Sequence, residues 1–213
     1  MFIRFHPWFN PPVAITQKQF AQLQSRVSAP KRGTRPVLAS PDQPRSASQV
    51  ILGIDPSLRG TGYGVLRLAK PHPEALAFGT IVCPAGWERS RCLVKIAATL
   101  RDLIREHRPT VCAIEGLFYA QNIQTALIMG EARGASLVAV AEAGLEIYEM
   151  APRKVKQAIV GYGAAQKLAV AKMVQRMLGL AEMPEADAAD ALALALAHAQ
   201  EHSRYSISTP KKI

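Results

Sequence analysis

Residues 50–65 read "VILGIDPSLRGTGYGV", and this stretch decides the fold. An apolar run ends in the charged residue Asp55, a turn-forming segment follows, and a second apolar stretch covers 61–69. A short apolar run that is bounded by turn residues is typical of a buried strand. The sequence therefore predicts two neighbouring strands with a carboxylate at the end of the first.

The rest of the chain extends this pattern into an α/β fold. A third strand is predicted over 75–83, a helix over 89–107 and a further strand over 110–115, which ends in Glu115. The remaining elements are a strand over 145–150 and helices over about 122–144, 152–160, 165–179 and 187–201. This order predicts a mixed sheet flanked by helices, in which three strands form an antiparallel meander and crossover helices add parallel strands.

Four acidic residues are candidates for one site. Asp55 and Glu115 end two predicted strands, and ligand sites of open α/β sheets lie at the carboxyl ends of parallel strands. Asp187 and Asp190 lie three residues apart in "PEADAADA" (184–191), hence on one face of a helix whose alanines would let it approach the sheet closely.

Four converging carboxylates repel one another unless cations lie between them. Oxygen ligands suit Mg²⁺ or Mn²⁺, and two such ions about 4 Å apart can activate water and stabilise the leaving oxygen of a phosphodiester. Taken singly, the acids have simpler explanations. Asp187 could cap a helix, Asp55 could be a turn residue before Pro56, and Glu115 could be a paired surface acid.

Gly60, Gly62 and Gly64 alternate along the second predicted strand. They fit neither a phosphate-binding loop that needs GK[ST] nor a dinucleotide fingerprint that opens a helix. Alternating glycines clear one face of a strand, which allows close approach by a nucleic-acid backbone or a metal site. A weakly packed hairpin is the alternative.

Composition is typical of an intracellular protein, and its positive charge indicates either a polyanionic partner or the solvation of a flexible tail. The net charge is +10, and residues 1–50 hold seven Lys and Arg against one acid. The three cysteines form no CxxC, so we expect a reduced, cytoplasmic protein, and no apolar run is long enough to span a membrane. His198 and His202 are expected to lie on the surface at a helix end.

Three regions are predicted along the chain: a basic, Pro/Ser/Arg-rich disordered leader at 1–49, a nuclease domain at 50–202 and a short basic tail at 203–213. The leader could be a targeting segment, a DNA-binding arm or the product of a start site assigned too far upstream.

Four segments together resemble the RuvC family of Holliday-junction resolvases. They are "ILGIDPSLRGTGYGV", "AIEGLFYAQNIQTALIMGEARGASLVA", "APRKVKQAIVGYGAAQKLAV" and "EADAADALALALAHA". The resemblance runs in order from about residue 50 to about residue 200. It implies an RNase H-like fold and a Mg²⁺-dependent homodimer that cuts two opposed strands of a four-way DNA junction. It also implies a branch-migration complex of the RuvA and RuvB type as a partner.

The same resemblance assigns roles to individual residues. Asp55, Glu115, Asp187 and Asp190 would be the catalytic carboxylates and would hold two metal ions, with Mn²⁺ as a possible substitute for Mg²⁺. Phe118 would stack on a base at the junction, with a core phenylalanine as the alternative, and Lys156 and Lys167 would lie near the scissile phosphate.

Two positions depart from the family pattern. Ser57 stands where the family usually has glycine, which predicts a slightly different first turn. Gln121 stands where many members have lysine, which removes one potential phosphate contact.

The predicted helix at 122–144 carries a seam of coiled-coil spacing: Ile123, Leu127, Gly130, Gly134, Leu137 and Ala141. Two glycines would weaken a helix unless another backbone packs closely against them. That backbone is either the chain's own sheet or the same helix of a second subunit, and we expect the second.

Three other functions compete with a junction resolvase. A kinase or ATPase of the actin-like superfamily shares the leading strand, acid and hairpin, but needs a second lobe for which this chain is too short. A non-catalytic junction-binding module would not need the four acids. An RNase H-like nuclease acting on ribosomal RNA precursor belongs to the same class but usually lacks the long seam helix.

Overall fold

The computed structural model describes residues 49–117, 122–203 and 211–212. These residues belong to one unit, Ser46–Ile213. The expectations for the leader, for Phe118 and Gln121 and for most of the basic tail concern residues outside the described ranges.

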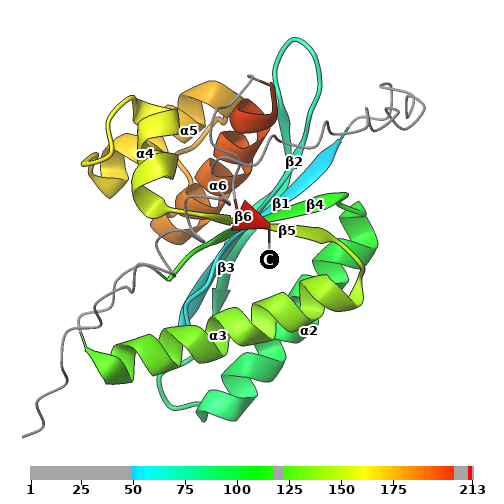
Figure 1. Ribbon diagram of the computed structural model, residues 1–213, viewed down its shortest axis with the longest axis vertical. Coiled ribbons are helices and arrows are strands. Elements are labelled where there is room, and N and C mark those ends of the chain that lie inside the picture. The colour runs from blue at the N-terminus through cyan, green and yellow to red at the C-terminus, as the bar shows by residue number, and fades with distance from the viewer. Residues whose placement is uncertain (1–48, 118–121, 204–210, 213) are drawn as a thin grey trace, which may run out of the picture. The chain divides into compact units, whose positions relative to one another are not determined.

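A six-stranded mixed sheet forms the centre of this unit, in the order β3-β2-β1-β4-β5-β6 (Figure 1). The first three strands pair antiparallel, β1, β4 and β5 pair parallel, and β6 is antiparallel to β5. The strands are β1 (Val50–Asp55), β2 (Gly60–Arg67), β3 (Glu74–Val82), β4 (Val111–Glu115), β5 (Glu146–Met150) and β6 (Lys211–Lys212).

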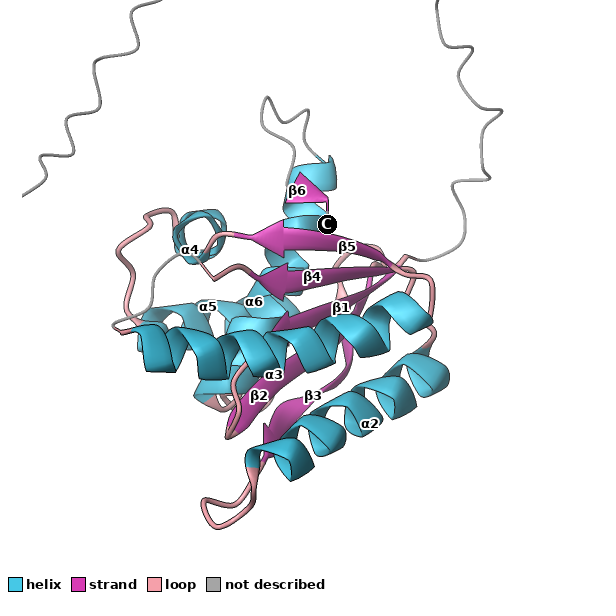
Figure 2. Ribbon diagram, turned by 60° about the horizontal axis from the view of Figure 1, so that its bottom comes forward, coloured by secondary structure: helices cyan, strands magenta, loops and turns pink. Residues whose placement is uncertain are grey.

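Helices cover both faces of the sheet. Figure 2 shows α2 and α3 together on one face, and α4, α5 and α6 on the other. Their bounds are α2 (Arg89–His107), α3 (Ile123–Glu142), α4 (Pro152–Val160), α5 (Lys167–Leu178) and α6 (Ala186–Ser203). Each face has its own apolar core: Leu52, Ile54 and Ile96 lie in the α2–α3 core, and Ile51, Leu66 and Leu192 in the α4–α6 core.

The predicted fold class is confirmed, including the antiparallel meander and the parallel strands. Three elements have the predicted bounds: β1, α2 and α4. Within the predicted basic tail, Lys211 and Lys212 form β6, which pairs with Glu149 and Tyr148 of β5.

Helix α6 lies unusually close to β1 and β2 because glycines face it. A Cβ added to Gly53 would lie 2.0 Å from the carbonyl oxygen of Ala191, and one added to Gly62 would lie 2.0 Å from that of Asp187. Backbone therefore packs on backbone. The alternating glycines of β2 serve a helix of the same chain, which corrects the expectation of a weakly packed hairpin or of a nucleic acid against this strand.

His198 and the three cysteines are buried. His198 is only 1% exposed and its ring centroid lies 4.8 Å from that of Tyr148, so the prediction of a surface histidine is wrong. Cys83, Cys92 and Cys112 are free thiols, and all three are buried. Among the described residues, no helix combines the length and the apolar character needed to cross a membrane.

Candidate active site

Two adjacent parallel strands bring Asp55 and Glu115 together. Ile54 of β1 is in register with Ile114 of β4, so the next residue of each strand reaches the same edge of the sheet. The Asp55 side chain lies within hydrogen-bonding reach of Glu115, and this contact helps to raise the pKa of Asp55. Glu115 therefore interacts with a second acid, in contrast to the alternative of a paired surface acid.

Helix α6 supplies Asp187 and Asp190. The helix begins at Ala186, so Asp187 lies inside the first turn and is not the N-terminal cap. A Cβ added to Gly60 would lie 2.8 Å from Oδ2 of Asp187, which shows how closely this carboxylate approaches β2. The position of both aspartates is thus set by the close packing of α6 on the sheet.

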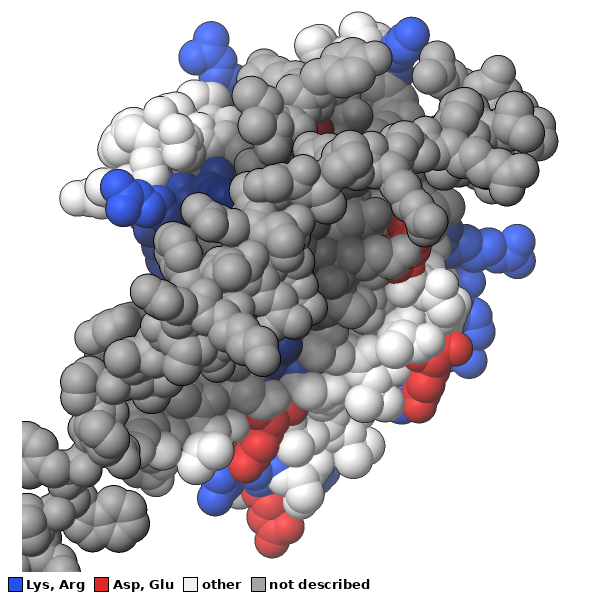
Figure 3. All heavy atoms as spheres, viewed as in Figure 1, with Lys and Arg blue, Asp and Glu red and all other residues white. Residues whose placement is uncertain are grey.

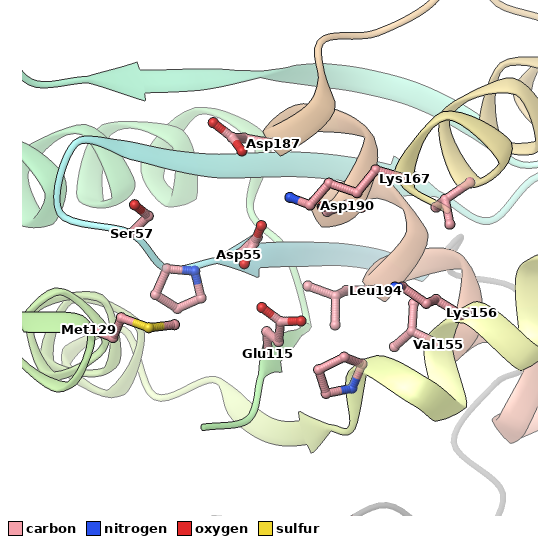
Figure 4. A pocket seen from close by; sticks show the side chains of 13 residues that line it. Asp55, Ser57, Glu115, Met129, Val155, Lys156, Lys167, Asp187, Asp190 and Leu194 are labelled. Atoms are coloured by element: carbon pink, nitrogen blue, oxygen red, sulfur yellow. Dashed lines mark ion pairs between the residues drawn. The ribbon is translucent and has the colours of Figure 1, made fainter. Parts of the chain in front are cut away.

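The four acids surround one cavity of about 310 Å³. Figure 4 shows the side chains of Asp55, Glu115 and Asp190 turned toward a shared space, with Asp187 at its edge. The lining residues are Asp55, Pro56, Ser57, Glu115, Met129, Pro152, Val155, Lys156, Lys167, Val170, Asp187, Asp190 and Leu194. Six of the seven site residues proposed from the sequence therefore line one cavity, and the seventh, Phe118, lies outside the described residues.

Lys156 and Lys167 bring positive charge to the lining of the cavity. Lys156 lies on α4, and Lys167 is the first residue of α5. The Lys167 amine lies 2.9 Å from the Asp190 carboxylate, and this hydrogen bond raises the pKa of the lysine. Lys167 therefore stays positively charged within the acidic cluster.

The cluster disfavours a full set of negative charges. Burial, the hydrogen bond and charge of Glu115 and the charge of Asp190 together raise the pKa of Asp55 to about 9, while the charge of Lys167 acts in the opposite direction. Asp55 therefore holds a proton at neutral pH in the metal-free protein.

These residues fit a divalent cation in their chemistry. Within residues 49–117, 122–203 and 211–212, no three acidic, histidine or cysteine side chains are grouped as ligands of one ion. However, the proton of Asp55 removes one negative charge from the cluster, and the Lys167 amine balances the charge of Asp190. A divalent cation would balance these negative charges better than either. Binding would require Asp55 to lose its proton.

The turn after Asp55 has an ordinary backbone. Ser57 donates its backbone N–H to Thr61 Oγ1 at 3.3 Å, and the Thr61 hydroxyl donates back to the Ser57 carbonyl at 2.5 Å. Arg108 is the one non-glycine residue in the described part of the chain with a positive φ. Serine at position 57 thus introduces no left-handed strain.

An ion pair beside the site was not predicted. The Arg133 guanidinium on α3 bonds the Glu149 carboxylate on β5, and both side chains are largely buried. Its Nε also donates to the backbone carbonyl of Glu115 at 3.4 Å. Helix α3 is therefore connected to the end of β4, and the long separation of these residues in the sequence left no local signal for it.

Comparisons with known proteins show the family to which this chain belongs. Residues 51–198 match the family model described as crossover junction endodeoxyribonuclease RuvC. A protein of that name from Rubrobacter xylanophilus is 44% identical over 162 residues, which cover 76% of this chain and 90% of the relative. Its counterpart from Coxiella burnetii is 48% identical over 158 residues, with 74% and 90% covered.

A solved structure with the same fold is that of T. thermophilus RuvC in complex with a Holliday junction substrate. Its TM-score is 0.70 at 35% identity, and the match covers 78% of this chain and 99% of that one. The match of family model, relatives and fold over the same residues sets aside the actin-like kinase alternative. The chain belongs to the RuvC family of crossover junction endodeoxyribonucleases.

Proposed function

We propose that this protein is a structure-selective endonuclease that cuts two opposed strands of a four-way DNA junction, in recombination and DNA repair. The observation that carries the proposal is the set of four carboxylates from β1, β4 and α6 around one cavity with two lysines, in a chain of the RuvC family. Metal-dependent phosphodiester hydrolysis uses acids that hold the metal and cations that stabilise the phosphate in the transition state.

The proposed cofactor is Mg²⁺, at two ions per site, with Mn²⁺ as a substitute. Asp55, Glu115, Asp187 and Asp190 would hold the ions. When bound, such ions lower the pKa of water and stabilise the leaving oxygen, which makes water the nucleophile and requires no covalent intermediate.

The chain's own side chains would orient the DNA. Lys167, released from Asp190 when metal offsets the acids, would contact the scissile phosphate, and Lys156 would approach it from α4. Phe118, three residues after Glu115, would stack on a base at the junction. Arg153 and Lys154 are exposed and would make more distant phosphate contacts.

We also propose a homodimer formed through α3. Ile123 and Leu127 are 80% and 63% exposed, and they share the seam with Gly130 and Gly134. A Cβ added to either glycine would meet no heavy atom within 4 Å, so the chain's own sheet does not explain the glycines. A second copy of α3 would explain them, and a two-fold dimer would place two sites on a two-fold symmetric junction.

The proposal extends to the cellular context. The protein would act in the cytoplasm together with a branch-migration complex of the RuvA and RuvB type. We propose a basic leader at 1–49, a nuclease domain at 50–202 and a short basic tail at 203–213, which contains β6.

The test is cleavage of a synthetic four-way junction beside linear duplex of the same sequence, with Mg²⁺ or with EDTA. We expect paired symmetric nicks in the junction alone, and only with metal. Asp190→Asn should abolish cleavage and spare junction binding, because phosphate contacts carry most of the affinity. Junction binding without a cut, on a mobile junction that offers many sequences, would favour the non-catalytic module instead.

A further inference from the structure

Helices α4 and α5 form a basic unit beside the cavity. Residues 150–181 contain six Lys and Arg and no acid. Figure 3 shows Lys and Arg side chains gathered at the side of the molecule where Figure 1 draws α4 and α5. Such a surface attracts the phosphate backbone of nucleic acid.

One large aromatic side chain lies within this basic unit. Tyr162, in the loop between α4 and α5, is 55% exposed. The loop joins the two helices that supply Lys156 and Lys167 to the cavity, and Lys167 follows Tyr162 by five residues. Tyr162 is therefore carried by the segment that connects two residues proposed to contact the scissile phosphate.

The exposure of Tyr162 comes from a well-anchored loop. Gly161 ends α4 with a φ of +96°, and its N–H donates to the carbonyl of Gln157. A Cβ added to Gly163 would lie 2.4 Å from Cγ of Arg153, so the loop packs directly on that side chain. Ala165 is 2% exposed and belongs to the α4–α6 core. Anchors thus flank the tyrosine on both sides while its ring stays accessible.

We propose that Tyr162 stacks on a nucleobase of the DNA strand next to the cleaved phosphate. An exposed ring, on a loop between two helices that bring lysines to a phosphodiester-cleaving site, matches the way in which proteins hold single-stranded nucleic acid, with cations on the backbone and aromatic rings on the bases. This inference rests on the proposed nuclease function and adds a residue that contacts the base.

The experiment measures binding of a labelled four-way junction in EDTA by wild type, Tyr162→Ala and Tyr162→Phe. Stacking on an aromatic ring contributes about 1–3 kcal/mol, so Tyr162→Ala should raise Kd by about 5- to 150-fold and Tyr162→Phe by less than about threefold. An uncharged contact leaves the slope of log Kd against log salt unchanged, whereas Lys154→Ala should reduce that slope by about one unit.

Leu168→Ala is the matched control, because Leu168 is 52% exposed on the same unit but is not aromatic. It should bind the junction as wild type does. Wild-type affinity in Tyr162→Ala, an equal loss in Tyr162→Phe or an equal loss in Leu168→Ala would each overturn the stacking role. Failure of wild type itself to bind or cut the junction would instead refute the proposed function.

Discussion

The amine of Lys167 lies 2.9 Å from the Asp190 carboxylate. The lysine that we propose to bind DNA is therefore the counter-ion of an aspartate that we propose to bind metal. The lysine is 63% exposed and the aspartate 22%, so the lysine can leave without unfolding the site. The lysine and a metal ion would thus compete for the same carboxylate.

Replacement of Lys167 should therefore have opposite effects on metal binding and on cleavage. Lys167→Gln removes the competing charge, so calorimetry without DNA should show tighter Mn²⁺ binding. Junction cleavage should fall on the order of 100-fold because the phosphate loses a cation. Lys70→Gln, in the exposed turn between β2 and β3, serves as the control and should change neither. Weaker Mn²⁺ binding by Lys167→Gln would contradict the competition.

The protonated Asp55 predicts how the stability of the metal-free protein depends on pH. Its pKa is about 9 in the folded chain and about 4 when unfolded, so the folded state holds more protons between these values. The contribution of Asp55 to the free energy of unfolding is therefore complete below about pH 4 and falls as pH rises toward 9. Urea unfolding in EDTA at several pH values should show this decline, and Mg²⁺ should reduce it.

Asp55→Asn should remove that decline and stabilise the metal-free protein at pH 7 by on the order of 2 kcal/mol, because the amide carries no charge to bury. The same variant should not cleave DNA. Asp102→Asn, on the exposed surface of α2, is the control and should keep the wild-type pH dependence. An unchanged profile in Asp55→Asn would refute the assignment of the proton to Asp55.

The contact between Gly62 and α6 predicts a severe effect of one methyl group. Gly62→Ala would place a Cβ against the Asp187 carbonyl, so we expect a loss of about 3 kcal/mol in the free energy of unfolding, together with loss of cleavage. Gly86→Ala is a fair comparison, because a Cβ there meets no heavy atom within 4 Å, and its urea midpoint should stay near wild type. Equal midpoints for the two variants would mean that α6 can move away at little cost.

The glycines of α3 predict that alanine in their place has opposite effects on the stability of one chain and on dimerisation. Gly130→Ala with Gly134→Ala should stabilise the isolated chain by about 1 kcal/mol per site, because alanine favours the helix. The added methyl groups should at the same time weaken a close contact between two α3 helices. Sedimentation equilibrium should show a shift toward monomer, and thermal unfolding at low concentration a higher midpoint. A monomeric wild type at micromolar concentration would exclude the dimer.

Local patterns in the sequence predicted most of the fold and brought together the four acids that line the cavity, whereas Lys156 and Lys167 came from the resemblance to a family. Apolar runs that end in acids located β1 and β4, and helical spacing gave the bounds of α2. The pairing of Lys211 and Lys212 with β5, the burial of His198 and the Arg133–Glu149 ion pair depend on residues distant in the sequence, for which periodicity carries no signal. The glycines of β2 were recognised as sites of close approach, but their partner, α6, could be found only in three dimensions.

The close seating of α6 on the sheet also limits how this site can diversify. At Gly53 and Gly62 the contacts are to backbone atoms, so no single side chain can be trimmed or enlarged to shift Asp187 and Asp190 by a small step. Gradual adaptation should therefore occur at other side chains that line the cavity, such as Met129 on α3 and Val155 on α4. A laboratory search for altered strand or metal preference should concentrate its libraries there.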